Sequence, residues 1–570
     1  MLCSRTLAFR VASVWGKLGL SACVALAATA ACGKSASQAP RTLHGGEAGG
    51  SGEPNPSEGG EAPDAGGAAP SGRAGAPSGG AGDAAGGAAG GPEGGAAAAE
   101  PSAAGQAGAP VEPTPTPGLS LRSITISQTH ELPLMKAGQE VAAGERPAPL
   151  IAGKHALVRA FVDLEPGFVG RPLLGVLDLK TSKVTRTLVS ERNLTRSSLQ
   201  DDLATTFVFD VEAADLNPDS TYRVRVLEAD TTPLAQYPKD GYFALGARAV
   251  APFELVVVPF IVNGFAPLLG DPQVSALRHR LLALYPLADI SITVAPAVTL
   301  PKAVNGDGDG WDEALDRIYR LRYDAEPAHD VFYYGALAPN ESFDRYCSDG
   351  CILGVANLAD ENDVDSRGAI GITVFQDGSG AEDAWDTVAH ELGHSLGRDH
   401  APCGFEDPSD TDPDYPYPNG TLGAIYGYDF DLARLVKPRP AKDMMGYCTP
   451  VWISDYTYRG LFERLGHIES EAFRALAFTP PELFRVARIG RSGQSRWLGE
   501  RHRRGSSRRT WLDLLNGAGQ RVGAVEAQVA SIDHASGGYV WLPAQQLAES
   551  ARNGALSVDL EPLGGAVLAL

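Results

Sequence analysis

Positive charge is scarce in this chain of 570 residues. Lysine and arginine together number 48, against 69 aspartates and glutamates, which gives a formal net charge of −21. Nucleic acids are bound through their phosphates by Lys and Arg, so this balance argues against a general affinity for nucleic acid. It is consistent with a soluble protein that is exported.

The N-terminal apolar run is too short to cross a bilayer comfortably. It extends from Leu18 to Ala31 behind a basic flank, which is typical of a signal-peptide core. It ends in Thr-Ala-Ala-Cys32, which resembles the bacterial lipobox, although the lipobox prefers Leu where Thr29 stands. We expect residues 1–31 to be a signal peptide and Cys32 to carry a lipid, so that the lipid anchor alone contacts the outer membrane of the cell envelope. Plain secretion is the alternative.

Aromatic and large aliphatic residues are almost absent from residues 32–118. The stretch is rich in Gly, Ala, Pro, Ser and Glu, as in GGAGDAAGGAAGGPEGGAAAAEP. Such a composition cannot bury enough apolar surface to form a core. We expect a disordered tether with a typical reach of roughly 50 Å, at a coil scaling of about 5–6 Å times the square root of residue number.

Cysteine is scarce as well. Of the seven cysteines, two leave with the signal peptide and Cys32 is the candidate for lipidation. The remaining four are Cys347, Cys351, Cys403 and Cys448. An even number in an oxidising compartment favours two disulfides. Of the three pairings that four cysteines allow, we favour Cys347–Cys351 with Cys403–Cys448; zinc binding by cysteines is the alternative, but no CxxC pair is present.

Hydrophobic patterning divides the remaining chain into three domains. Residues 119–250 alternate apolar and polar side chains in short runs such as TYRVRVLEA, which is typical of a β-sandwich. Residues 251–475 alternate strand-like and helix-like segments, as in FELVVVPFIV and VSALRHRLLALYP, which predicts an α/β layer with a largely parallel sheet. Residues 476–570 predict a small β domain. Within it the basic segment RWLGERHRRGSSRR is either a patch for an acidic polymer or a solvated loop.

Three of the eleven histidines lie within the segment HELGHSLGRDH, residues 390–400. Residues four apart share one face of a helix, so His390 and His394 can hold one ion. A hydrolytic zinc site needs a third protein ligand and one open position. His400 could be that ligand only if the chain reverses, because on a straight helix it would lie about 15 Å along the axis from His390. Gly397 stands where a left-handed residue would end the helix and turn the chain back.

Glu391 adds a catalytic group to this arrangement. It follows the first candidate ligand and faces the open side, where it could take a proton from zinc-bound water and pass it to the leaving amine. HExxH alone occurs by chance in unrelated helices, whereas the five-point pattern has a chance expectation on the order of 1 in 10⁴ for this chain. We therefore predict a zinc site and reject a solvent-facing, histidine-rich helix.

The pattern resembles the motif of the metzincin family of zinc endopeptidases, HExxHxxGxxH followed by a methionine-containing turn. The chain has only four methionines, yet two are adjacent in DMMGY, residues 443–447. The resemblance, which covers about residues 253–475, implies that Met445 lies beneath the zinc. It also implies that Tyr447 ligates the zinc or stabilises the oxyanion; a tyrosine that only packs is the alternative. Ala401 and the following Pro402-Cys403 fit no well-known branch of the family.

A second candidate metal site lies at residues 305–316. Oxygen donors at Asn305, Asp307 and Asp309, glycine at position six and Asp316 at position twelve resemble a calcium-binding loop. The segment departs from that loop because Asn opens it and Asp replaces the bidentate Glu. A calcium site and a helix-capping turn remain the alternatives.

These observations predict a multidomain, exported zinc metalloendopeptidase that acts on proteins or glycoproteins. One alternative is a catalytically inactive binding or adhesion lipoprotein of the cell surface that keeps the zinc fold. The intact Glu391 counts against it, because a binding protein needs no proton shuttle. A metal-dependent hydrolase of non-peptide bonds is a third interpretation. The sequence leaves the cleavage preference, the activation route and the oligomeric state open.

Overall fold

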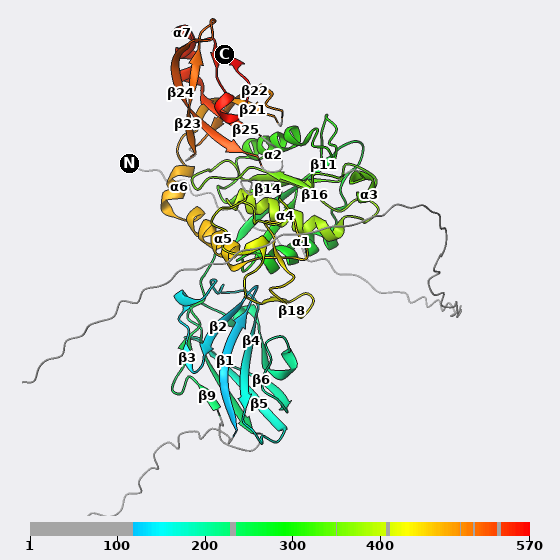
Figure 1. Cartoon of the computed structure of the whole chain (residues 1–570), viewed down its shortest axis with the longest axis vertical. Helices are drawn as coiled ribbons and strands as arrows, with labels where there is room; N and C mark the ends of the chain where they lie inside the picture. Colours follow the sequence, from blue (N-terminus) through cyan, green and yellow to red (C-terminus); the bar gives the residue numbers. More distant parts are fainter. Residues whose placement is uncertain are drawn as a thin grey trace, which may run out of the picture. The chain divides into compact units, whose positions relative to one another are not determined.

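The computed structural model describes residues 118–570, apart from 229–234, 349, 406–410, 491, 505–507 and 533–536. The predicted signal peptide, Cys32 and the tether lie outside the described residues, apart from the last tether position, Gly118. The described residues belong to one compact unit, Ala104–Leu570, and they confirm a multidomain, mainly β protein with few helices (Figure 1). No helix among them combines the length and apolar character that a membrane span requires.

Two antiparallel sheets form the N-terminal body. The first has the order β3-β2-β1-β4-β7 and the second the order β10-β8-β5-β6, with β9 paired to β8. The strands are β1 Leu119–Ser127, β2 Glu131–Lys136, β3 Gln139–Glu140, β4 Ala156–Leu164, β5 Arg171–Lys180, β6 Thr185–Leu194, β7 Phe207–Val211, β8 Thr221–Glu228, β9 Ala235–Tyr237 and β10 Phe243–Ala244. The alternation read from the sequence is visible in β8, where Tyr222, Val224 and Val226 are buried between partly exposed neighbours. The inner faces of the two sheets share one core.

The central body is built on a mostly parallel sheet with the order β12-β11-β14-β16-β15, in which only β15 runs antiparallel. Its elements are β11 Phe253–Ile261, α1 Asp271–Leu284, β12 Ile290–Val294, β13 Val298–Thr299, α2 Trp311–Ala325, β14 Val331–Leu337, α3 Phe343–Tyr346, β15 Gly354–Ala356, β16 Gly368–Ile372 and α4 Ala381–Ser395. Strand β14 is buried on both faces. Phe332 and Tyr334 share a core with α1 and α4, whereas Tyr333 and Leu337 share a core with α2. Helices therefore cover both faces of the sheet, as a parallel sheet requires.

The chain after α4 is irregular until two helices close the central body. Its short elements are β17 Gly427–Asp429, β18 Arg434–Val436, β19 Lys442–Asp443 and β20 Val451–Trp452, followed by α5 Asp455–Ile468 and α6 Glu471–Ala477. Ser454 caps α5, because its side chain accepts a hydrogen bond from the backbone N–H of Thr457. Strands β19 and β20 pair in parallel and hold the two ends of the segment that carries Met445.

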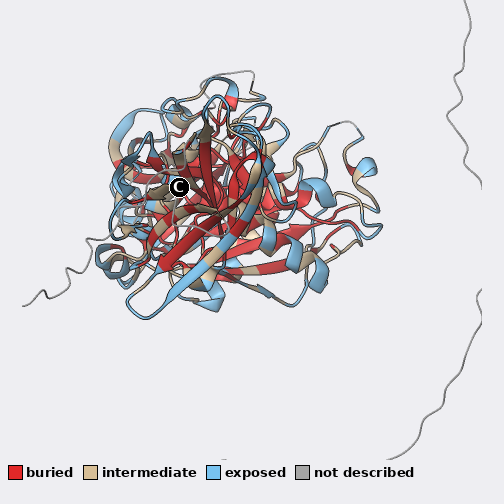
Figure 2. Ribbon diagram, turned by 90° about the horizontal axis from the view of Figure 1, so that it is seen from below, coloured by how far each residue is buried: buried red, intermediate tan, exposed pale blue. Residues whose placement is uncertain are grey.

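The C-terminal body is a seven-stranded sheet with the order β22-β21-β25-β24-β23-β26-β27. Its elements are β21 Glu482–Ile489, β22 Ser495–Arg503, β23 Arg509–Leu515, β24 Arg521–Ser531, β25 Gly538–Pro543, α7 Ala544–Arg552, β26 Ser557–Val558 and β27 Leu568–Ala569. Helix α7 buries Leu547 against the sheet, and the sequence pattern of this region indicated only β structure. Buried residues follow the strands, as Figure 2 shows in red.

The basic segment 496–509 differs from both interpretations of its sequence. Much of it is strand β22, and four of its arginines bind acidic side chains of the central body, namely Arg496, Arg501, Arg503 and Arg504. Arg496 pairs with Glu313 at 2.9 Å, and Arg503 pairs with Asp363 at 2.6 Å, with each side chain of the latter pair only 3% exposed. The described part of the segment, residues 496–504 and 508–509, is therefore mainly paired strand rather than a free patch for an acidic polymer or a solvated loop. Its charge holds the C-terminal sheet against the central body.

A buried polar seam joins the N-terminal and central bodies. Lys154 donates from Nζ to the carbonyl of Tyr285 at 2.7 Å and to Oγ1 of Thr129 at 3.1 Å. Burial lowers the pKa of Lys154 to about 7. The hydroxyl of Tyr285 in turn donates to the carbonyl of Ala389 at 2.6 Å, next to His390. The seam thus reaches the helix that carries the histidine motif.

Candidate metal centre

The histidine motif occupies the buried end of α4 and the turn that follows it. The helix ends in a left-handed residue, Gly397, with φ of +75°. The backbone N–H of Gly397 bonds to the carbonyl of His394 at 2.8 Å, and that of Arg398 bonds to the carbonyl of Gly393 at 2.9 Å. This is the Schellman arrangement, which satisfies the last carbonyls of a helix while the chain turns back. The chain reverses at the glycine that the sequence singled out.

The reversal brings three imidazoles together. One nitrogen atom from each of His390, His394 and His400 lies within 4.8 Å of the others, and all three residues are buried. The ring centroids of His394 lie 4.7 Å from those of both His390 and His400. The three predicted ligands therefore share one site.

Backbone carbonyls orient two of the rings. Nδ1 of His390 lies 2.8 Å from the carbonyl oxygen of Met444, and Nδ1 of His394 lies 2.7 Å from that of Arg398. A carbonyl can only accept, so each Nδ1 carries the proton and each Nε2 of a neutral ring carries a lone pair. These two Nε2 atoms face each other at 3.0 Å. Facing lone pairs repel each other unless a cation lies between them, so the donor set fits a bound metal ion.

Glu391 lies beside the histidines, on the side of strand β15. Its side chain is 1% exposed and packs over Gly354, where a Cβ atom would overlap Oε1. Gly354 pairs with Gly371 of β16, and a Cβ at Gly371 would overlap the hydroxyl of the buried Tyr334. Gly354 therefore makes room for the Glu391 carboxylate, and Gly371 on the neighbouring strand makes room for the hydroxyl of Tyr334.

The methionine turn lies directly under the helix. A Cβ on Gly393 would come within 2.5 Å of the sulfur of Met445, so the thioether packs against the helix backbone between the first two histidines. Asp443 holds the turn: its carboxylate accepts from the backbone N–H groups of Met445 and Ser454, both at 2.8 Å. Burial raises the pKa of this carboxyl, and the hydrogen bonds oppose the rise. The sequence analysis quoted Asp443 but assigned it no role.

Tyr447 lies beside the third histidine. Its hydroxyl is 3.1 Å from Nε2 of His400, and the residue is 44% exposed. The ring of Phe405 lies 4.2 Å from that of Tyr447 and 4.4 Å from that of His400, measured between centroids. Sequence reasoning missed Phe405, because no motif marks an aromatic residue in an irregular segment.

Both predicted disulfides are present. The Cα atoms are 4.9 Å apart in Cys347–Cys351 and 5.8 Å apart in Cys403–Cys448, which are ordinary separations. The second disulfide joins the segment after His400 to the residue after Tyr447. The backbone N–H of Tyr447 also bonds to the carbonyl of Cys403 at 2.8 Å. The two chain segments that flank the histidines are therefore fixed to each other.

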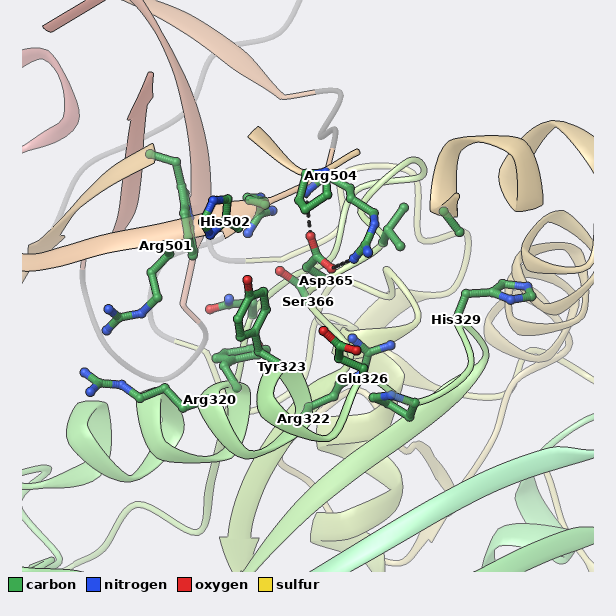
Figure 3. A pocket seen from close by; sticks show the side chains of 18 of the residues that line it. Arg320, Arg322, Tyr323, Glu326, His329, Asp365, Ser366, Arg501, His502 and Arg504 are labelled. Carbon is green, nitrogen blue, oxygen red and sulfur yellow. Dashed lines mark hydrogen bonds and ion pairs between the residues drawn. The ribbon is translucent and has the colours of Figure 1, made fainter. Parts of the chain in front are cut away.

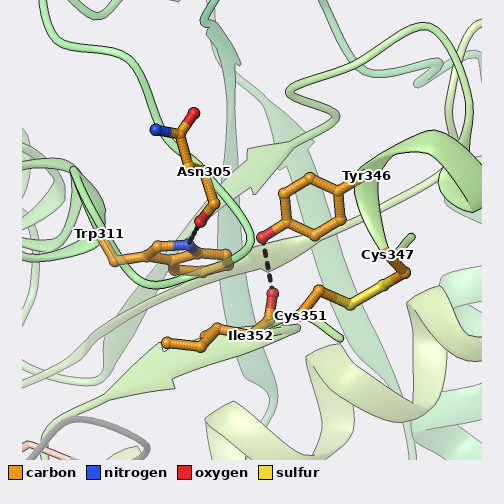
Figure 4. Close-up of a disulfide and its surroundings, with 6 residues drawn as sticks. All are labelled: Asn305, Trp311, Tyr346, Cys347, Cys351 and Ile352. Carbon is orange, nitrogen blue, oxygen red and sulfur yellow. Dashed lines mark hydrogen bonds between the residues drawn. A yellow bond between two sulfur atoms is a disulfide. The ribbon is translucent and has the colours of Figure 1, made fainter. Parts of the chain in front are cut away.

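The candidate calcium loop closes on itself. The backbone N–H of Asn305 bonds to the carbonyl of Asp309 at 3.0 Å, and Nε1 of Trp311 donates to the carbonyl of Asn305 at 3.0 Å (Figure 4). The carboxylate of Asp309 pairs with Lys302 at 2.8 Å. Helix α2 then begins after Gly310 without a side-chain cap. The helix-capping turn, the alternative to calcium, therefore also lacks its defining hydrogen bond.

The twelfth position of that loop is engaged elsewhere. Asp316 pairs with Arg501 of β22 at 3.2 Å and with Arg320 one turn along α2. Within the described part of the chain, Asp307, Asp309 and Asp316 do not form a group of candidate ligands. The structure therefore does not bring the predicted calcium ligands together. The carboxylate of Asp316 instead binds the two arginines.

Comparison with known proteins supports a peptidase. The family model of Peptidase M66 matches residues 366–449, which include the three histidines, Glu391 and the methionine turn. M66 is a metallopeptidase family, in agreement with a histidine group that could bind a metal. No curated protein matches the chain.

Among solved structures, the chain is similar to a calcium-binding mutant of Bacteroides uniformis beta-glucuronidase 2. The identity is 8% and the TM-score is 0.15, over 38% of this chain and 29% of that one. The chain therefore spans less than a third of that structure's length. At this TM-score the similarity does not bear on fold or function.

Proposed function

We propose that this protein is a zinc-dependent endopeptidase of the metzincin type, which hydrolyses peptide bonds of proteins or glycoproteins outside the cytoplasm. The observation that carries the proposal is the convergence of His390, His394 and His400 on one point beside a buried carboxylate. The match of this segment to a peptidase family supports it.

Zinc is the ion that best suits this donor set. A tetrahedral zinc ion with nitrogen ligands at about 2.0–2.1 Å separates those nitrogens by roughly 3.3 Å, close to the 3.0 Å between Nε2 of His390 and Nε2 of His394. Three neutral imidazoles leave one coordination position open, as in hydrolytic zinc sites. When bound, zinc supplies Lewis acidity, which lowers the pKa of water and polarises a carbonyl group.

Glu391 is the proposed general base. It follows His390 on the helix, and the space above Gly354 holds its carboxylate near the histidines. In this position the carboxylate takes a proton from the attacking water and then donates it to the leaving amine. The low exposure of the group limits competition from bulk water for that proton.

Tyr447 is the proposed hydrogen-bond donor to the oxyanion. Its hydroxyl is within hydrogen-bond distance of His400, and its partial exposure leaves the phenol accessible from the substrate side. An O–H donor placed where negative charge develops stabilises the transition state more than the ground state. Met445 and Asp443 contribute by holding this turn in place.

Export is part of the proposal. The two disulfides are consistent with an oxidising compartment, and the lipid anchor at Cys32 remains a proposal from the sequence. An inactive adhesion lipoprotein remains the second candidate, and the buried Glu391 counts against it.

A proteolysis assay on the purified chain tests the proposal. Casein and a densely glycosylated protein serve as substrates, with and without a chelator, followed by addition of zinc. Glu391→Ala is compared with Glu382→Ala, an exposed glutamate in the first turn of the same helix. Loss of cleavage in Glu391→Ala with bound zinc retained supports the peptidase. Equal cleavage by both variants rejects the mechanism, and zinc binding without any cleavage by the wild type favours the adhesion protein.

A further inference from the structure

A cavity of about 570 Å³ lies between the central body and the C-terminal sheet (Figure 3). Its walls are the second half of α2, the segments that precede β14 and β16, the end of α6 and strands β22 and β25. None of the three histidines of the metal centre lines it. Its volume is in the range of small-molecule sites, which occur preferentially between domains.

Arginine dominates the charged lining of this cavity. Five arginines face three carboxylates; the arginines are Arg320, Arg322, Arg501, Arg503 and Arg504. Arg320 and Arg501 pair with Asp316, and Arg504 pairs with Asp365. Arg503 pairs with Asp363, which lies outside the lining. Of the arginines and carboxylates that line the cavity, only Arg322 and Glu326 therefore make no ion pair within the described structure.

Arg322 has side-chain N–H donors that make no hydrogen bond within the described structure. The residue is 6% exposed, and its Nε donates to the carbonyl of Val331 at 3.1 Å. Its two terminal nitrogens make no hydrogen bond or ion pair with any described residue. These two nitrogens are not among the fully buried unsatisfied atoms, so they open toward the cavity that Arg322 lines. A ligand in the cavity could accept hydrogen bonds from them in place of water.

Arg367 adds a second buried positive charge beside Arg322. It is 1% exposed, and none of its three side-chain nitrogens has a hydrogen-bond partner within the described structure. Its guanidinium lies 5.1 Å from the ring centroid of Phe332 and 4.9 Å from that of Phe473. Burial, followed by repulsion from Arg322, lowers the pKa of Arg367 to about 9. The charges of Asp363 and Asp330 oppose this shift. Arg367 does not line the cavity, so its positive charge acts there only through space.

Polar and aromatic side chains complete the lining. Oδ1 of Asn357 and Nε1 of Trp541 are buried there without a hydrogen-bond partner in the described structure. The aromatic rings of Tyr323 and Phe478 line the same space, and they are 43% and 82% exposed. Rings of this kind provide apolar contact for the uncharged part of a ligand.

We propose that this cavity binds a small organic anion, whose oxyanion group is held by Arg322 and whose planar body lies among the aromatic side chains. Carboxylate, phosphate and sulfate groups all match the planar fork of a guanidinium. The orphaned donor at Trp541 and acceptor at Asn357 provide further polar contacts. The site is separate from the metal centre, and the proposal does not depend on the peptidase activity.

Calorimetric titration of the full chain tests the proposal with phenyl phosphate, inorganic phosphate and benzylamine as probes. Phenyl phosphate should bind with one-to-one stoichiometry and more tightly than inorganic phosphate, and benzylamine should not bind. The titrations are repeated after zinc has been removed with a chelator, because phosphate can also bind a metal. Binding that disappears with the metal would overturn the proposal.

Variants assign the binding to the cavity. Arg322→Gln should weaken phenyl phosphate binding by at least about tenfold, since a charge-assisted hydrogen bond is lost. Glu326→Gln removes a carboxylate from the same lining and should tighten binding or leave it unchanged. Arg434→Gln, at an exposed position of β18, is the matched control and should have no effect.

Melting temperatures of all three variants show whether each is folded. If Arg322→Gln is unstable, Arg322→Lys, which keeps the charge but loses the planar fork, replaces it and should weaken binding by a smaller factor. Unchanged affinity in the folded Arg322 variant, or lower affinity in Glu326→Gln, would overturn the proposal.

Discussion

The hydroxyl of Tyr447 lies 3.1 Å from Nε2 of His400, and this contact connects the methionine turn to the third histidine of the metal centre. The phenol is therefore close enough to act on a substrate bound at that centre, yet it belongs to a different chain segment from the HExxH helix. The position is compatible with both roles that the sequence left open for Tyr447, catalysis and packing, and an experiment can distinguish them.

Replacement of Tyr447 by Phe keeps the ring and removes the donor. We expect kcat to fall by about 10- to 1,000-fold with little change in KM, because the hydrogen bond forms with the charge of the transition state. Steady-state kinetics and zinc content by mass spectrometry measure the two effects. Tyr242→Phe, in the N-terminal body, is the control. Unchanged kcat in Tyr447→Phe would leave the residue a packing role only.

Metal removal should lower the melting temperature. Nε2 of His390 and Nε2 of His394 direct lone pairs at each other, and a bound cation relieves that repulsion. A ligand that binds only the folded state at 1,000 times its Kd stabilises that state by about 4 kcal/mol. Calorimetry of the chelated and zinc-saturated protein measures the difference. In His400→Ala, zinc should raise the melting temperature much less than in the wild type. An equal rise in this variant would contradict the three-histidine site.

Gly397→Ala should destabilise the end of helix α4. The residue has φ of +75°, and an added Cβ would lie 2.9 Å from the carbonyl oxygen of Ala359. We expect a loss of roughly 1–2 kcal/mol in unfolding free energy, together with weaker zinc binding. Gly466→Ala in α5, where an added Cβ meets nothing within 4 Å, is the matched control and should be neutral or stabilising. If urea titration gives the same unfolding free energy for both variants, an alanine fits the chain turn at position 397 without strain.

Lys154 should make stability rise with pH. Its pKa is about 7 in the folded protein and 10.5 when unperturbed, so the unfolded chain binds more protons between these values. Stability contributed by this group therefore increases from about pH 7 to pH 10 and is flat below pH 7. Lys154→Met should remove that part of the slope. Melting temperatures of both proteins at pH 7, 8 and 9 test this, and parallel pH profiles would disprove it.

The Arg503–Asp363 pair should be strongly coupled. Both side chains are 3% exposed, so Arg503→Met leaves a buried, uncompensated carboxylate and should cost about 3–5 kcal/mol. The double variant Arg503→Met, Asp363→Asn should recover much of the loss. The exposed pair Arg521–Asp513 should show less than about 1 kcal/mol in the same double-mutant cycle. Similar coupling energies in the two cycles would contradict the buried role of the first.

Sequence patterns were most informative where chemistry fixes the spacing. The motif in residues 390–400 located the three histidines that converge and the glycine of the turn, because helical periodicity and the left-handed conformation constrain both. The alternation of strands and helices similarly indicated the elements of the central sheet. Local rules of this kind need only neighbouring residues.

Contacts between residues far apart in the sequence could not be predicted from the sequence. Asp316 appeared to be the last calcium ligand until Arg501, 185 residues away, proved to be its partner. The basic segment of β22 was misinterpreted for the same reason, since its acidic partners lie in another domain. Asp443 escaped attention because its role depends on two backbone N–H groups that only the folded turn presents.

The Cys403–Cys448 disulfide has a consequence for when the site is complete. It joins the segment that follows His400 to the residue that follows Tyr447, so a chain in which it has not formed keeps only backbone hydrogen bonds between these two segments. If the chain is the peptidase that we propose, its reduced form should cleave substrate more slowly than its oxidised form.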